Sequence, residues 1–222
     1  MQTRTLTALA LAALIALAGC GGSDKTKTKS TAATSTPTTA TETTPTISKP
    51  TLKLAKGHTY TAQMITSLGE IDIKLDAKHS PKTVASFVAL ARKGFFDKLI
   101  FHRVAHSPTG GDFVIQGGDP TGTGQGGPGY SVVEAPPKST RYTRGLVAMA
   151  KTATEAPGTS GSQFFIVTAE DAGLPADYAV LGRVAKGMNA VTAIAATPTD
   201  PQTERPKTPV VIRQVKIVEK RS

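Results

Sequence analysis

From His58 onward the sequence is a succession of short apolar segments separated by turns rich in glycine and proline. The chain has 21 Gly and 15 Pro in 222 residues, which favours many turns over a helical bundle. Residues 59–66 and 70–75 alternate in polarity on either side of Leu68 and Gly69, which is typical of an antiparallel hairpin. Many short strands with two helices predict a closed β-barrel with helical plugs.

Two segments carry helix signals. Ser80 and Pro81 supply an N-cap residue and a proline at the first helical position, and Gly94 follows as a stop signal. The apolar residues between them, Val84, Phe87, Val88 and Ala91, have helical spacing. A second short helix is predicted over residues 187–196. Further strands are predicted over residues 99–104, 145–150, 163–168, 179–184 and 210–218.

The N-terminus has the pattern of an export signal. Arg4 precedes an apolar run over residues 6–17, which is too short to span a bilayer but suits a signal peptide. The run ends in LAGC at residues 17–20, which resembles the lipobox of bacterial lipoproteins, and Cys20 is the only cysteine. We therefore expect a signal peptide over residues 1–19 and lipid on Cys20. An ordinary secretory signal is the alternative.

A polar segment separates this signal from the apolar pattern. Residues 20–56 are rich in Thr, Ser, Lys and Pro, so we interpret them as the lipidated cysteine and a flexible linker. The folded domain is then predicted over residues 57–222. The protein would be anchored to the cell membrane through its lipid, on the extracytoplasmic side.

Five short strings stand out in the predicted domain: PKTV at residues 81–84, FHRV at 101–104, FVIQGGD at 113–119, GSQFFI at 161–166 and LGRV at 181–184. Together they resemble the motifs of cyclophilin-type peptidyl-prolyl cis-trans isomerases. They occur in the family's order from residue 58 to about 220. The resemblance implies a mainly β fold, a closed eight-stranded antiparallel barrel capped by two α-helices. It also implies an isomerase that assists the folding of exported, proline-containing polypeptides, acting as a monomer.

The resemblance also implies the site residues. Arg103 is expected to be catalytic, because a planar charged donor can stabilise the twisted amide of an X-Pro bond. The residues expected to bind substrate are Phe113, Val114, Gln116, Ala150, Lys151, Gln163, Phe165, Leu174 and Tyr178. Rotation breaks no covalent bond, so no metal or cofactor is required. The net charge of +10 permits contact with anions, but its scattered Lys and Arg without interleaved aromatic residues argue against nucleic acid.

The sequence departs from the family pattern at several positions. Gly173 stands where many members have Trp, which predicts weak sensitivity to cyclosporin. Tyr178 replaces a frequent His, Lys151 replaces a frequent Asn, and residues 104–112 are longer than usual. These departures motivate the alternative function, a catalytically weak proline-peptide-binding module or holdase chaperone that uses the same groove.

Overall fold

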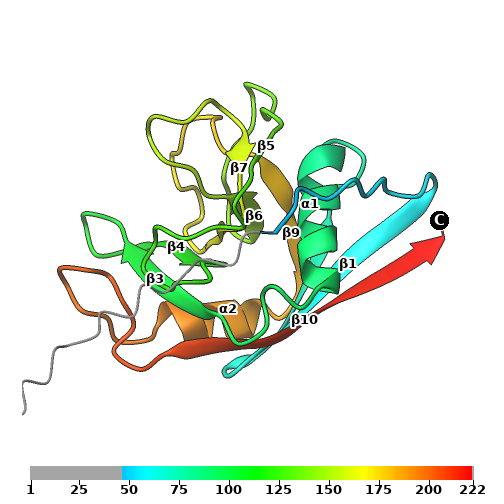
Figure 1. The fold of residues 1–222 in the computed structure, drawn as a ribbon. Helices are drawn as coiled ribbons and strands as arrows, with labels where there is room; N and C mark the ends of the chain where they lie inside the picture. Colours follow the sequence, from blue (N-terminus) through cyan, green and yellow to red (C-terminus); the bar gives the residue numbers. More distant parts are fainter. Residues whose placement is uncertain (1–46, 222) are drawn as a thin grey trace, which may run out of the picture. The chain divides into compact units, whose positions relative to one another are not determined.

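The computed structural model describes residues 47–221, in which eight antiparallel strands form a closed barrel (Figure 1). The strand order around the barrel is β1-β10-β3-β4-β8-β6-β9-β2. The barrel strands are β1 (His58–Thr66), β2 (Gly69–Leu75), β3 (Ile100–His106), β4 (Asp112–Gly117), β6 (Leu146–Met149), β8 (Phe164–Val167), β9 (Val180–Lys186) and β10 (Val210–Arg221). Helices α1 (Pro81–Arg92) and α2 (Met188–Ala195) pack against it, and β5 (Val132–Val133) pairs with β7 (Thr159–Ser160) in a small separate sheet. The predicted eight-stranded antiparallel barrel with two helices is confirmed.

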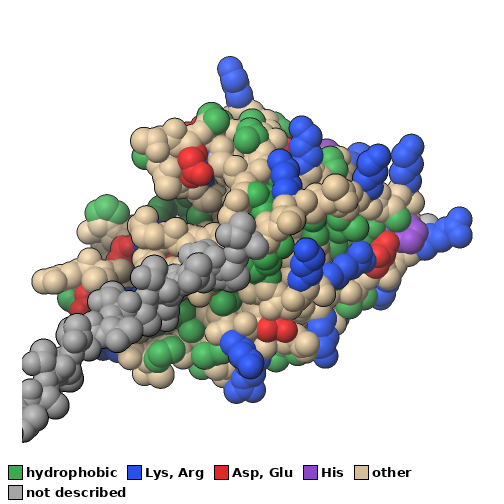
Figure 2. Space-filling model, in the orientation of Figure 1, with side chains coloured by type: hydrophobic (Ala, Val, Ile, Leu, Met, Phe, Trp, Pro, Cys, Tyr) green, Lys and Arg blue, Asp and Glu red, His purple; other side chains and the backbone are tan. Residues whose placement is uncertain are grey.

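The predicted signal peptide, Cys20 and residues 21–46 of the predicted linker lie outside the described residues. Within residues 47–221, neither helix is long and apolar enough to cross a membrane. Lys and Arg side chains are scattered over the upper, right and lower parts of the face shown in Figure 2. The positive charge on this face is therefore not gathered in one patch.

Residues 47–56, which we assigned to the flexible linker, contact the barrel. Ile47, Leu52 and Leu54 are half-buried against the core. The amide of Ile47 donates to the carbonyl of Pro128 at 2.9 Å, and the amide of Ala55 donates to the hydroxyl of Tyr60 at 2.9 Å. Among the described residues, the segment 47–56 thus packs on the barrel, ahead of the predicted domain boundary at residue 57. The reason is that these apolar residues, although sparse, lie close enough to the barrel to bury surface on it.

The barrel strands divide their apolar side chains between an inner core and an outer cluster. Along β8, Phe164 and Ile166 belong to the inner core, whereas Phe165 and Val167 belong to the outer cluster. Phe164 is the centre of the inner core, where the rings of Phe87, Phe96 and Phe101 lie at centroid distances of 6.2, 6.1 and 6.0 Å. Because side chains alternate along a strand, the same four-residue strand fills the interior and builds a second apolar surface outside.

A β-bulge on β3 breaks this alternation. Phe101 pairs with Gly117 and Arg103 pairs with Gln116, so His102 is an extra residue opposite a single step of β4. Phe101 and Val104, three positions apart, therefore both point into the inner core, and Arg103 lies on the outer side. In a regular strand Arg103 would share the inner face with Phe101. The bulge is what places the arginine outside the barrel.

The long segment after Arg103 extends a hairpin. Strand β3 continues to His106 and β4 begins at Asp112, and Ser107 closes the turn between them. The amide of Ser107 donates to the carbonyl of Gly111 at 2.7 Å, and its hydroxyl accepts from the amide of Gly111 at 3.0 Å. Residues 104–112, which we expect to be longer than usual, thus belong to a regular hairpin.

The start of α1 differs from the sequence prediction. Ser80 occupies the N-cap position and Pro81 the first turn, but the Ser80 side chain makes no capping hydrogen bond. The carboxylate of Glu134 instead accepts from the amides of Lys82 at 3.2 Å and Thr83 at 2.8 Å. A carboxylate at this end also interacts favourably with the helix dipole. The predicted serine cap is therefore replaced by Glu134, which lies 52 positions after Lys82 in the chain.

We expect the buried His102 to make stability depend on pH. Burial lowers the pKa of its imidazole, against the opposing charge of Asp119, and neither ring nitrogen has a partner within the described residues. The unfolded chain takes up a proton on this imidazole near pH 6.5, which is above the pKa of the folded state. The stabilisation that comes from a neutral His102 is therefore complete above about pH 6.5 and is lost as the pH falls below it. We expect the free energy of unfolding in urea to fall between about pH 7.5 and about pH 5.

His102→Phe keeps a ring in the same space and cannot take up a proton, so its unfolding free energy should fall less over this pH range. The exposed residue His106 provides the control, and His106→Gln should retain the wild-type fall. An equal fall in wild type and His102→Phe would contradict the assignment.

Candidate active site

A pocket of about 150 Å³ lies on the outer side of the barrel, over the outer apolar cluster. Its volume suits one small ring, since pockets for larger ligands are several-fold bigger. The residues that line it are Arg103, Phe113, Val114, Gln116, Ala150, Lys151, Phe165, Leu174 and Tyr178. All nine belong to the predicted set. The tenth, Gln163, lies beside the pocket and is hydrogen-bonded to Gln116.

The apolar half of the pocket is held by aromatic packing. The rings of Phe165 and Tyr178 meet edge to face with centroids 5.4 Å apart, and Tyr142 packs at 5.8 Å from Tyr178. The hydroxyl of Tyr142 donates to the carbonyl of Tyr178 at 2.7 Å and accepts from its amide at 2.9 Å. Burial raises the pKa of Tyr142 to about 12, so this hydroxyl keeps its proton. Tyr142 thus fixes the backbone of Tyr178.

Sequence reasoning did not identify Tyr142. It lies in the loop before β6, where no periodic pattern marks it as buried, yet its side chain is fully enclosed. An aromatic residue within a polar loop was the only available signal.

The polar half of the site is a chain of hydrogen bonds that ends on Arg103. The amide nitrogen of Gln163 donates to the carbonyls of Gly124 at 3.0 Å and Gly126 at 2.9 Å. The amide nitrogen of Gln116 donates to the side-chain oxygen of Gln163 at 2.9 Å. This leaves the side-chain oxygen of Gln116 to accept from Nη1 of Arg103 at 3.4 Å. The chain of bonds orients both glutamine amides.

Glu204 completes this chain and was not predicted. Its carboxylate accepts from Nε of Arg103 at 2.5 Å. Glu204 lies in the loop between α2 and β10, and its backbone has a left-handed φ of 56°. Its carbonyl accepts from the amide of Val104 at 2.8 Å, which ties this loop to β3. A partner 101 positions from the arginine leaves no local pattern in the sequence.

The glycine-rich loop after β4 is organised by Asp119. Its buried carboxylate accepts from the amide and hydroxyl of Thr121, both at 2.8 Å, and from the amide of Gly124 at 2.5 Å. Burial alone would raise the pKa of Asp119, but these hydrogen bonds hold it below its usual value. A Cβ at Gly126 would lie 2.0 Å from the Asp119 carboxylate, so the loop requires glycine there. The loop therefore presents fixed carbonyls to Gln163.

A second, larger pocket of about 420 Å³ adjoins the first. The two share Gln116, Ala150 and Lys151 in their walls. The second also contacts the glycine-rich loop and the turn that contains Thr152 and Glu155. An extended chain with a ring in the smaller pocket can therefore place its neighbouring residue in the larger one.

The positions that depart from the family pattern take different places. Tyr178 and Lys151 line the pocket, whereas Gly173 is exposed, with a left-handed φ of 62° and open space around it. A side chain is thus missing on the rim next to Leu174, and the pocket itself is intact.

The chemistry available to the pocket is non-covalent. Its nine lining residues include no serine, cysteine, histidine or carboxylate, and Arg103 offers a planar charged donor beside an apolar wall. Such a site can bind a small ring and stabilise negative charge or a lone pair next to it.

Comparison with known proteins agrees with this geometry. Residues 61–217 match the family model described as cyclophilin type peptidyl-prolyl cis-trans isomerase/CLD. The chain is 40% identical over 178 residues to peptidyl-prolyl cis-trans isomerase B of Streptomyces anulatus, covering 72% of this chain and 97% of that protein. It is also 40% identical over 177 residues to peptidyl-prolyl cis-trans isomerase A of Mycobacterium tuberculosis, covering 72% and 92%.

A solved structure gives the same result. The crystal structure of a Cryptosporidium parvum cyclophilin type isomerase, determined in the presence of the dipeptide Ala-Pro, matches with a TM-score of 0.63 at 31% identity. The match covers 71% of this chain and 98% of that one, so a protein of little more than this barrel folds on its own. The chain therefore belongs to the cyclophilin family of peptidyl-prolyl cis-trans isomerases.

Proposed function

We propose that this isomerase accelerates rotation about X-Pro bonds in exported polypeptides, with Arg103 as the catalytic residue, while lipid on Cys20 holds it at the membrane. The observation that carries the proposal is the position of the Arg103 guanidinium in the wall of a pocket sized for one small ring. The related Cryptosporidium parvum isomerase was crystallised in the presence of Ala-Pro, which supports a proline ring as the occupant.

The barrier to rotation comes from amide resonance, which keeps the X-Pro bond planar and costs about 20 kcal/mol to break. In the twisted transition state the proline nitrogen becomes pyramidal and regains a lone pair. A donor aimed at that nitrogen stabilises the transition state more than either planar isomer, which is the condition for catalysis. Arg103 supplies this donor, while the apolar wall formed by Phe113, Phe165 and Leu174 holds the ring.

Glu204 and Gln116 prepare the arginine for this role. They accept from Nε and Nη1, which leaves other N–H groups of the guanidinium free to face substrate. Because the guanidinium is already oriented, little reorganisation accompanies the reaction. Glu204 is therefore a positioning residue in this proposal.

The proposed setting depends on the N-terminal sequence. The LAGC string ending at Cys20 supports lipid attachment, and the polar residues that follow support a tether. Clients would then be polypeptides that fold outside the cytoplasm. The holdase alternative gains no support from the pocket, because Lys151 and Tyr178 line it without closing it.

Arg103→Ala should reduce isomerisation of a short X-Pro peptide by about 100-fold or more in kcat, in line with the loss of a transition-state donor. Exchange measured by NMR on residues 47–222 gives the rate without a coupling protease. Arg103→Lys should recover little, because it lacks the planar donor group. Arg213→Ala, on the exposed side of β10, is the matched control and should retain activity. A folded Arg103→Ala protein with wild-type kcat would overturn the mechanism.

Glu204→Gln should lower kcat by roughly threefold to fivefold, because a half-exposed ion pair contributes up to about 1 kcal/mol. KM should change little, since the pocket lining is untouched. The exposed Glu170 provides the control, and Glu170→Gln should match wild type in both constants. A rise in KM at constant kcat would show that Glu204 acts on binding instead.

Cys20→Ala should release the protein from the membrane, because no other cysteine can carry the lipid. Fractionation of cells that express the full chain checks this, with metabolic labelling by palmitate as the second readout. Wild type should be labelled and membrane-bound, and Cys20→Ala should be neither. Labelled Cys20→Ala protein would refute the lipid site.

A further inference from the structure

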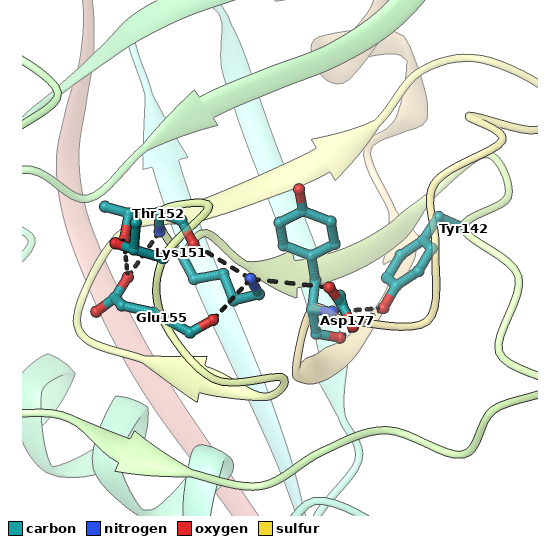
Figure 3. Close-up of polar contacts among 7 residues, drawn as sticks. Tyr142, Lys151, Thr152, Glu155 and Asp177 are labelled. Atoms are coloured by element: carbon teal, nitrogen blue, oxygen red, sulfur yellow. Dashed lines mark hydrogen bonds and ion pairs between the residues drawn. The ribbon is translucent and has the colours of Figure 1, made fainter.

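Lys151 follows β6 and carries a buried ammonium group that the proposed chemistry does not use. Its side chain is only 5% exposed, which is rare for lysine unless the charge is well paired. Nζ donates to the carbonyls of Thr152 at 3.2 Å and Glu155 at 3.1 Å, and it lies 3.8 Å from the carboxylate of Asp177. Figure 3 shows the ammonium between the turn at Thr152 and Glu155 and the segment that carries Asp177.

The turn on one side of the ammonium is held by polar contacts alone. The carboxylate of Glu155 accepts from the amide of Thr152 at 2.6 Å and from its hydroxyl at 3.0 Å. Residues 152–157 are all exposed, so little apolar burial fixes the turn in place. A segment of this kind keeps its position only as long as its hydrogen bonds persist. The two bonds from Nζ of Lys151 add to the chain connection at Thr152 and tie the carbonyl of Glu155 to the pocket wall.

The segment on the other side carries an aromatic wall of the pocket. Nζ of Lys151 lies 5.7 Å from the centre of the Tyr178 ring, within the range of a cation–π contact. The carbonyl of Asp177 accepts from the amide of Gly158 at 2.7 Å. The Asp177 segment is therefore also joined to the residue that directly follows the exposed residues 152–157. One ammonium therefore links a wall of the small pocket to a wall of the large one.

We infer that Lys151 is a positioning residue for substrate binding. Its ammonium sets the distance between the 152–155 turn and Tyr178, and so the shape of the small pocket and of its junction with the larger one. The inference rests on the proposed binding of an X-Pro peptide across these pockets. It assigns to the side chain of Lys151 a role in peptide affinity, separate from the hydrogen-bond donation by Arg103.

The test is Lys151→Met in residues 47–222. Methionine keeps the apolar stem and removes all three N–H donors, and Asp177 is exposed enough to lose its partner without being left as a buried charge. We expect KM for an X-Pro peptide to rise roughly fivefold, with kcat within about twofold of wild type, since preorganisation acts mainly on binding. Amide NMR signals of Thr152, Glu155 and Tyr178 should shift. Lys186→Met, at an exposed position on β9, is the matched control and should change neither constant.

The result that overturns the inference is an unchanged KM, whether or not the turn amides shift, or a loss confined to kcat. If Lys151→Met unfolds below the assay temperature, Glu155→Ala opens the same turn from its exposed side and must raise KM in the same way. Failure of the catalytic proposal remains distinguishable. NMR titration of the peptide into Arg103→Ala, with and without Lys151→Met, measures affinity without turnover, and equal affinities would also overturn the inference.

Discussion

The closure of the barrel by β10 is the constraint on which the rest of this structure depends. Strand β10 pairs with β1 along nearly its whole length and with β3 at Val210 and Val211, so it joins the first hairpin to the strands that carry the site. Closure leaves no free edge in the sheet and creates an interior that Phe164 and its aromatic neighbours fill. With the interior packed, a ligand site must be built on the outside, from the alternate residues of the same strands.

The outward position of Arg103 follows from a local irregularity. The bulge at His102 lets Phe101 and Val104 point inward while Arg103 points outward. The cost of the bulge is a histidine enclosed without hydrogen-bond partners in the described residues. What it provides is a guanidinium held between Glu204 and Gln116 beside an apolar pocket. The position of this guanidinium connects the bulge in β3 with the proposed mechanism.

The site consists of a hydrogen-bonded polar half and an aromatic wall, and different residues hold each in place. A chain of hydrogen bonds runs from the glycine-rich loop through Gln163 and Gln116 to Arg103 and orients its guanidinium. The aromatic wall is supported by Tyr142, whose hydroxyl donates to the backbone carbonyl of Tyr178. In our inference it is also supported by Lys151, whose ammonium lies 5.7 Å from the centre of the Tyr178 ring. In the proposed mechanism, a change in the aromatic wall can therefore alter binding without altering the arginine donor.

The sequence patterns by themselves predicted seven of the eight barrel strands and both helices, while β4 was not predicted as a strand. The strings shared with the family supplied the expectation of eight strands and the residues that line the pocket. The sequence could do so because alternation of polarity, turn residues and the short family strings are local patterns along the chain. Only the tertiary structure decided which contacts these elements make with distant parts of the chain. Glu204 pairs with Arg103, Glu134 accepts from the amides at the start of α1, Ile47 packs on the core, and the Lys151 ammonium is buried. These partners meet through barrel closure and loop packing across separations of tens of residues. Pairing between a loop carboxylate and a charged group at that separation leaves no periodic signal, so only the folded chain identifies it.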